Sequence, residues 1–119
     1  MRLRPLLAAL LVAGLAFTAR AAELYGRPLR GLTPVRLAEL GKKPAEYDGK
    51  TIRVRGDVLS EAGAFHLAEG DARLLVTLRD GTPLPKDVKG ASAAAEGVFR
   101  AKGPGGAPAL EATGVELTR

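Results

Sequence analysis

The stretch that decides the fold is YDGKTIRVRGDVL, which runs from Tyr47 to Leu59. It opens with the turn-forming residues Asp48-Gly49-Lys50 and continues as a strand whose side chains alternate between two faces. Gly56 interrupts this strand where a small barrel has to bend sharply. The pattern predicts the first strand of a compact β-barrel, with Ile52, Val54 and Val58 facing the core and Arg53, Arg55 and Asp57 facing outward.

The first 21 residues have the pattern of a cleavable signal peptide. Arg2 and Arg4 precede the uncharged run Pro5–Phe17, and Ala19-Arg20-Ala21 supplies small residues at the spacing that signal peptidase accepts. We expect cleavage before Ala22 and therefore a periplasmic or secreted protein. The alternative is an uncleaved membrane anchor, but an apolar run of about 13 residues is shorter than the roughly 20 that a spanning helix needs.

The mature chain is small and only weakly basic. Removing residues 1–21 leaves 98 of the 119 residues, and the loss of Arg2, Arg4 and Arg20 lowers the net charge from +5 to +2. This length suits one domain with a modest core. The chain has no cysteine, which excludes disulfides, thiol catalysis and cysteine-bound metal.

Residues 22–46 are expected to form a lead-in to the barrel. Glu23–Leu32 carries glycine and proline and is predicted to run extended along the surface. Thr33 is predicted to be the N-cap of a short helix that Pro34 begins and Gly41 ends. A further helical turn is expected at Pro44–Tyr47. The side chains predicted to plug one end of the barrel are Leu37, Leu40 and Tyr47.

Residues 47–119 contain five predicted strands. Glu69-Gly70-Asp71 is a hairpin turn between the second and third, Thr82–Gly90 is a loop with at most one helical turn, and Lys102–Pro108 is a flexible hairpin loop. A change of apolar parity near Gly114 indicates a bulge in the last strand. Five short strands with the longest connection after the third predict an all-β fold, a small five-stranded OB-like barrel with a short N-terminal helix. The strands are Thr51–Leu59, Ala64–Ala68, Arg73–Arg79, Ala91–Arg100 and Ala109–Leu117.

These segments carry a family resemblance. The pieces are YGRPL at Tyr25–Leu29, LAELGKKPAEYDGKTIRVRGDV at Leu37–Val58, LPKDVKG at Leu84–Gly90 and AEGVF at Ala95–Phe99. With them the chain resembles an uncharacterised family of secreted bacterial OB-like domains, a domain of unknown function. The resemblance implies a cysteine and then a Gly-Cys-Trp motif after the first strand. Residues 60–65 lack both cysteines, so no metal or redox role of those cysteines carries over.

One predicted face of the barrel is rich in arginine. If the alternating apolar residues fill the barrel, the opposite face of the first three strands presents a polar set that would bind an anion or a nucleic acid. The alternative is a solvated face whose arginines pair with Asp57, Glu96, Glu111 and Glu116. The face offers no aromatic side chain for base stacking, which argues against single-stranded nucleic acid. The candidate ligand-binding residues are Arg53, Arg55, His66, Arg73, Thr77, Arg79 and, in the last loop, Lys102.

No catalytic or metal site is expected. His66 is the only histidine, and one histidine without cysteine does not make a structural zinc site. Ser60 and Ser92 lie in no motif that would present a nucleophile. Gly103, Gly105 and Gly106 lack the Lys-Ser/Thr ending of a phosphate loop. We therefore expect neither a metal nor a cofactor.

The sequence thus favours an exported, non-catalytic binding or interaction module of the bacterial cell envelope. We expect a monomer whose partner is an unidentified ligand or envelope protein. The alternative is binding of nucleic acid or of an acidic oligosaccharide through the arginine-rich face, in which case affinity would fall steeply with salt.

Overall fold

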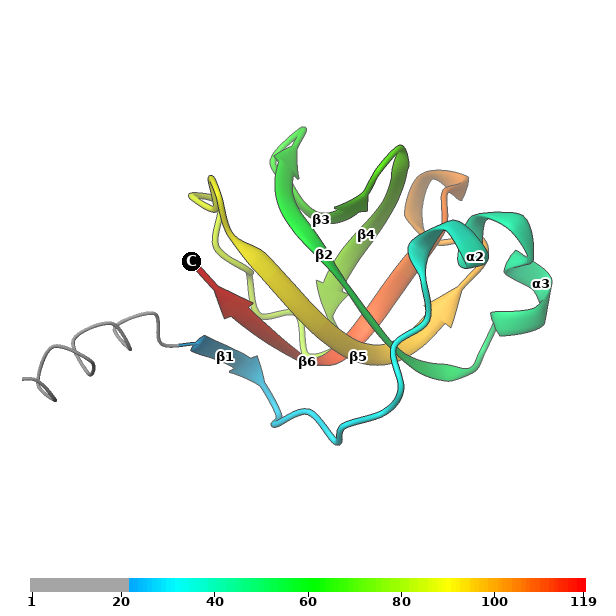
Figure 1. Cartoon of the computed structure of the whole chain (residues 1–119), viewed down its shortest axis with the longest axis horizontal. Coiled ribbons are helices and arrows are strands. Elements are labelled where there is room, and N and C mark those ends of the chain that lie inside the picture. Colours follow the sequence, from blue (N-terminus) through cyan, green and yellow to red (C-terminus); the bar gives the residue numbers. More distant parts are fainter. Residues whose placement is uncertain (1–21) are drawn as a thin grey trace, which may run out of the picture.

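A computed structural model describes residues 22–119. Its centre is a closed five-stranded β-barrel, as the sequence predicts (Figure 1). The barrel strands are β2 (Thr51–Glu61), β3 (Ala64–Glu69), β4 (Ala72–Leu78), β5 (Ser92–Arg100) and β6 (Ala109–Thr118). They follow one another around the barrel in the order β2-β3-β4-β6-β5 and back to β2. The predicted signal peptide lies outside the described residues.

The pairings explain how so short a chain closes a barrel. β4 and β6 run parallel, and the other barrel pairs are antiparallel. The first half of β2 pairs with β5 and its second half pairs with β3, so β2 bends around the barrel at Gly56. A Cβ at Gly56 would lie 2.5 Å from the carbonyl oxygen of Ala68, which is why glycine occupies the bend.

The barrel interior is apolar, and the inward-facing residues are those predicted. The predicted core residues Ile52, Val54 and Val58 are buried, and β5 and β6 add Phe99, Leu110, Val115 and Leu117. One end is closed by the short helices α2 (Leu37–Lys42) and α3 (Pro44–Tyr47). Leu37 and Leu40 are buried and Tyr47 packs against the same core, which confirms the predicted plug.

The last strand contains the predicted bulge. Glu96 of β5 lies opposite Gly114, and the next residue, Gly97, lies opposite Ala112. Thr113 is therefore the extra residue on β6, and the inward-facing parity changes there from Leu110 and Ala112 to Val115 and Leu117.

Two predictions for the lead-in need correction. The segment is extended, but it is more than a surface run, because β1 (Ala22–Gly26) pairs antiparallel with β6 as a sixth strand. β4 pairs with one edge of β6 only as far as Ala112, and β1 pairs with the same edge beyond that residue. Thr33 is not the helix N-cap: α2 begins at Leu37, and Pro34 instead forms a parallel bridge with Arg53. The proline thus continues the extended chain rather than the helix.

Candidate functional site

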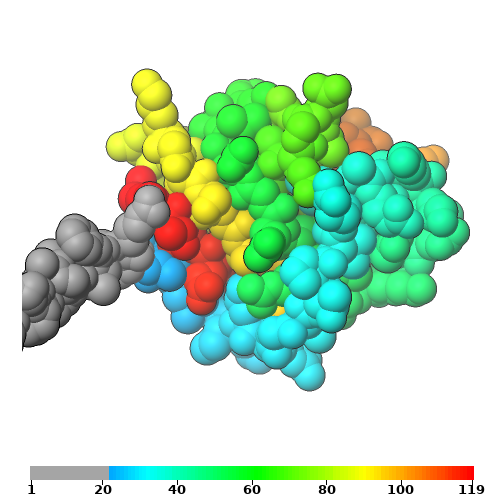
Figure 2. All heavy atoms as spheres, in the orientation of Figure 1, coloured from blue at the N-terminus to red at the C-terminus, as the bar shows by residue number. Residues whose placement is uncertain are grey.

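Residues 27–36, which we call the strap, cross the outer face of β6, β5 and β2 on the way from β1 to α2. In Figure 1 the strap is the cyan chain that runs below the sheet from β1 and then rises past β2 to α2, and in Figure 2 its atoms cover the lower part of the barrel wall. Beneath it, Gly114, Glu96 and Arg53 lie side by side on the three strands. A Cβ at Gly114 would collide with the carbonyl oxygen of Arg27, so the strap can pass only over a glycine.

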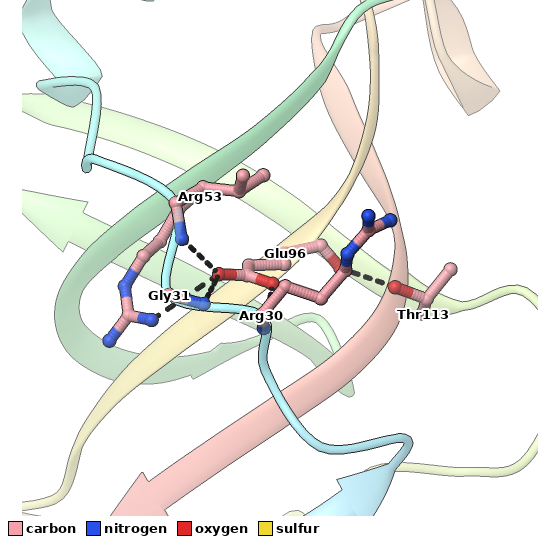
Figure 3. A network of polar contacts seen from close by, with 6 residues as sticks. Arg30, Gly31, Arg53, Glu96 and Thr113 are labelled. Carbon is pink, nitrogen blue, oxygen red and sulfur yellow. Dashed lines mark hydrogen bonds and ion pairs between the residues drawn. The ribbon is translucent and has the colours of Figure 1, made fainter.

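Glu96 fastens the strap. Its carboxylate accepts hydrogen bonds from the backbone amides of Arg30, Gly31 and Leu32, at 2.5, 2.9 and 2.9 Å, and from the guanidinium of Arg53 at 3.3 Å (Figure 3). Gly31 has a φ of 84°, in the left-handed region, which lets three successive amides turn toward one carboxylate. Glu96 is only 2% exposed although it belongs to the outward-facing set of β5, because the strap covers it.

Burial and hydrogen bonding act in opposite directions on Glu96. Burial by itself raises the pKa of this carboxyl. The amides of Arg30, Leu32 and Gly31 and the guanidinium of Arg53 outweigh that effect together, and the pKa lies below the ordinary value. Glu96 is therefore ionised at neutral pH, and it is the buried charge that holds the strap to the barrel.

A second carboxylate holds the far end of the strap. Glu69, at the end of β3, accepts hydrogen bonds from the amide of Leu37 at 3.0 Å and from Nε of Arg36 at 2.7 Å. The amide of Leu37 belongs to the first turn of α2, so a side chain from another element satisfies a helix end whose own N-cap, Arg36, makes no capping bond. Acids from the barrel thus anchor the strap at its middle, through Glu96, and at its C-terminal end, through Glu69.

The strap forms one wall of a groove of about 650 Å³ on the outside of the barrel. Pro34, Val35 and Arg36 line that wall, β2 lines the adjoining side, and Glu116 and Thr118 of β6 line the opposite side. The floor contains the small residues Gly56, Ser92 and Ala94. A volume of this order is typical of small-molecule sites in proteins.

The register of the strands determines which polar side chains lie opposite one another in the groove. Arg55 lies opposite Ala94, which lies opposite Glu116 on the far strand. In the next outward-facing row, Asp57 lies opposite Ser92, which lies opposite Thr118. Since neighbouring strands are about 4.8 Å apart, charges on β2 and β6 face each other across a floor roughly 10 Å wide.

The free charge of the groove is mixed rather than basic. Arg36 pairs with Glu69 and Arg53 pairs with Glu96, so two of its three arginines are already neutralised. Within residues 22–119, the charged groove residues without an ion pair are one cation and two anions. These are Arg55, Asp57 and Glu116.

The seven candidate residues do not form one face. Because β2 bends around the barrel, Arg53 and Arg55 lie where β2 pairs with β5 and share the groove. His66 lies on β3, where its Nδ1 is 3.1 Å from the carbonyl oxygen of Ala64, and its neighbours across the strands are Leu59 and Leu75. The expected convergence of arginines with the histidine is absent among residues 22–119.

The remaining candidates are dispersed. Arg73 of β4 donates to the carbonyl oxygen of Gly70 at 2.8 Å and pairs with Glu61 at 3.8 Å. Thr77 is exposed on β4, and Lys102 is exposed in the loop between β5 and β6. Arg79 follows β4 and lines a separate depression. The alternative reading, in which face arginines pair with neighbouring acids, is confirmed for Arg53 with Glu96.

The sequence analysis did not predict that the strap forms a wall of the groove, or that small residues form its floor. The floor has a readable signal, since Ser92 and Ala94 alternate outward in β5 with no bulky side chain. The wall has none, because the bonds from the strap to Glu96 join residues 64 to 66 positions apart in the chain.

Among residues 22–119, no histidine lines the groove, and the hydroxyl groups that line it are those of Ser92 and Thr118. The hydrogen bond of His66 is to the backbone of its own strand, and Ser92 lies beside Asp57 and Thr118 on other strands. Residues 22–119 bring no three histidine or acidic side chains together as a metal-binding group. Within the same residues, no helix is long and apolar enough to cross a membrane.

Three kinds of comparison with known proteins were made. No model of a protein family, no curated protein and no solved structure matches this chain. The resemblance to secreted bacterial OB-like domains therefore stays a prediction, carried by the sequence motifs alone.

Proposed function

We propose that this chain is an exported, non-catalytic binding module of the bacterial cell envelope, which holds its ligand in the groove between the strap and β6. The observation that carries the proposal is the groove itself, a site of about 650 Å³ with a floor of small residues and charged sides. The positively charged N-terminus and apolar run of the sequence support export. We propose that the protein binds its ligand as a monomer.

The proposal includes an OB-type barrel. Its support is the strand order, in which the first barrel strand pairs with the second and the fourth, and the third runs parallel to the fifth. The resemblance of the sequence motifs to secreted OB-like domains points the same way. Barrels of this type use their outer surface and connecting loops for binding, which suits a groove outside a filled core.

The ligand class follows from the free charges of the groove. One unpaired cation and two unpaired anions complement a small ligand that carries charges of both signs. A short peptide with a free carboxylate and two amino groups has this pattern: its carboxylate faces Arg55 and its amino groups face Asp57 and Glu116. Such a ligand matches the groove better than a polyanion does.

The alternative partner is a nucleic acid or an acidic oligosaccharide bound through arginines. Two observations make it the weaker candidate. Arg53 and Arg73 already have carboxylate partners, and none of the residues from 22 to 119 that line the groove is aromatic. Asp57 and Glu116 would also repel a polyanion from the floor between them.

The test is an amide chemical-shift titration of the purified protein with three probes. These are the dipeptide Lys-Ala, an oligothymidine and polygalacturonate, each at two salt concentrations. We expect Lys-Ala to shift the amides of Ser92 and Ala94 in a saturable way. Replacing Ala94 by leucine fills the floor and removes the response, whereas Ala107→Leu, at an exposed loop position, leaves it unchanged.

The outcomes separate the partner classes. A saturable response to oligothymidine or polygalacturonate that weakens steeply with salt supports the alternative partner. Groove shifts with Lys-Ala that persist in Ala94→Leu contradict the placement of the ligand. If none of the probes moves the groove amides, the proposed binding function is wrong in this form.

A further inference from the structure

We propose a second binding site, separate from the groove, in which Arg27 and Arg79 hold a doubly charged oxyanion such as a phosphate group. Both arginines line a depression of about 630 Å³ where β1 and β4 end against the bulge of β6. The depression shares no lining residue with the groove. The two arginines of the depression favour an anion, whereas the charges without an ion pair in the groove are of both signs.

The β6 bulge brings the two arginines together. The amide of Arg79 donates to the carbonyl oxygen of Ala112 at 2.9 Å, and the amide of Arg27 donates to that of Thr113, also at 2.9 Å. Successive carbonyls of a regular strand point to opposite edges. Here both face the edge away from β5, because Thr113 is the extra residue of the bulge. The two backbones are therefore anchored at adjacent positions of one strand.

The pair carries unneutralised positive charge. Neither Arg27 nor Arg79 makes an ion pair within residues 22–119, and both are exposed. The acid that lines the same depression is Asp80, whose Oδ1 accepts a hydrogen bond from the amide of Thr82 at 2.8 Å. Of the charged residues at this site, two are cations and one is an anion that is turned to its own loop.

An oxyanion with two charges fits this arrangement. Each guanidinium presents several donors in a planar fork that matches two oxygens of a phosphate. Two forks held on a fixed strand edge bind such a group with little loss of backbone freedom, and the bound anion removes the repulsion between the arginines. A singly charged carboxylate satisfies only one fork.

The test uses inorganic phosphate as the first probe, at constant ionic strength, with amide shifts as the readout. We expect saturable shifts at Arg27, Arg79 and Thr113, and a dissociation constant about tenfold higher in either Arg27→Gln or Arg79→Gln. The matched control is Arg30→Gln, which removes the same charge from an exposed strap residue outside the depression. Thermal denaturation confirms that each variant is folded.

Further arms identify the source of the phosphate. Glycerol phosphate represents soluble phosphomonoesters, and vesicles of phosphatidylcholine with and without phosphatidic acid represent a lipid headgroup. Loss of binding in both arginine variants, in whichever arm binds, supports the site. The proposal is overturned if the shifts do not saturate, if folded Arg27→Gln and Arg79→Gln bind as the unmodified protein does, or if Arg30→Gln weakens binding equally. Because the groove amides are not the readout, this result is independent of the groove proposal.

Discussion

At the scale of single residues, Glu96 connects the sequence, the fold and the site. The strand pattern places it outward, and the sequence analysis names it as a partner for arginine, which its contact with Arg53 confirms. Its larger role was not predictable, since three of its four donors are backbone amides of the strap. Backbone amides occur at every residue except proline, so no residue type marks the segment that supplies them.

Removing the Glu96 carboxylate is expected to cost much more stability than removing an exposed one. Glu96→Ala leaves three amides and a partly buried guanidinium without their acceptor, so the free energy of unfolding should fall by about 3 kcal/mol. Glu96→Gln keeps one acceptor oxygen and should cost about 2 kcal/mol. The control is Glu111→Ala, which breaks the exposed pair with Arg100 and should cost less than about 1 kcal/mol. Urea denaturation measures all three, and equal losses for Glu96→Ala and Glu111→Ala would contradict the role of Glu96 in holding the strap.

The stability of the protein should fall in acid through the same residue. Because the pKa of Glu96 in the folded protein lies below the ordinary 4.5, its ionised form stabilises the fold fully above that pH. This stabilisation is lost as the pH falls through the lower pKa of the folded state. Unfolding free energies measured between neutral and acidic pH should therefore drop less steeply for Glu96→Gln than for the unmodified protein. Identical pH profiles for the two proteins would show that Glu96 does not control the acid sensitivity.

At the scale of elements, the sequence predicts what depends on local pattern and misses what depends on distant partners. β2 to β6 were predicted because their apolar residues alternate between recognisable turns, and the bulge was predicted from a change of parity. β1 was missed because five residues that end in Gly26 carry too little alternation, and their partner strand lies about 90 positions away. The helix start was misplaced because Thr33-Pro34 has a good capping pattern, whereas the acid that serves α2 comes from β3.

Replacing Gly56 at the bend of β2 by alanine is expected to destabilise the protein, whereas replacing Gly41 in α2 is expected to stabilise it. In Gly56→Ala the new Cβ would meet backbone atoms of Ala68, the nearest at 2.5 Å, and the strands must move apart at a cost of about 2 kcal/mol. Gly41 lies in α2 with no atom near its Cβ position, so Gly41→Ala should stabilise the protein by roughly 0.5 to 1 kcal/mol. The two denaturation midpoints should move in opposite directions. A neutral Gly56→Ala would mean that β2 does not approach β3 so closely.

At the scale of the whole molecule, the lead-in and the barrel form one unit. β1 completes the edge of β6, the strap covers Glu96, and α2 plugs the barrel. Residues 22–47 thus contribute in turn to the sheet, to the buried polar contacts outside the barrel and to the core. The candidate groove depends on this arrangement, because the strap supplies its wall. The barrel strands alone predict an arginine-rich face on β2, β3 and β4, whereas the groove lies over β2, β5 and β6, where acids of the barrel make its charge mixed.

The dependence of the groove on the strap can be tested at Gly114, which lies under the strap and away from the groove lining. In Gly114→Ala the new Cβ would collide with the carbonyl oxygen of Arg27, so the strap must lift from β6. We expect hydrogen exchange at the amides of Gly31 and Leu32 to accelerate by about ten- to a hundredfold, since a strain of 1–3 kcal/mol falls on their contact with Glu96.

Hydrogen exchange at the amides of Leu67 and Leu74 in the β3–β4 hairpin should stay unchanged. The hairpin pairs with β6 only from Ala109 to Ala112, before the strand reaches Gly114. Lys-Ala binding in the groove should weaken in the same variant, since Pro34 and Val35 move with the strap. If the exchange of Gly31 and Leu32 accelerates while groove binding keeps its full strength, the strap is a stabilising element only and the wall of the binding site lies elsewhere. If exchange accelerates equally at Leu67 and Leu74, the barrel itself has loosened, and the strap is not a separable part of the fold.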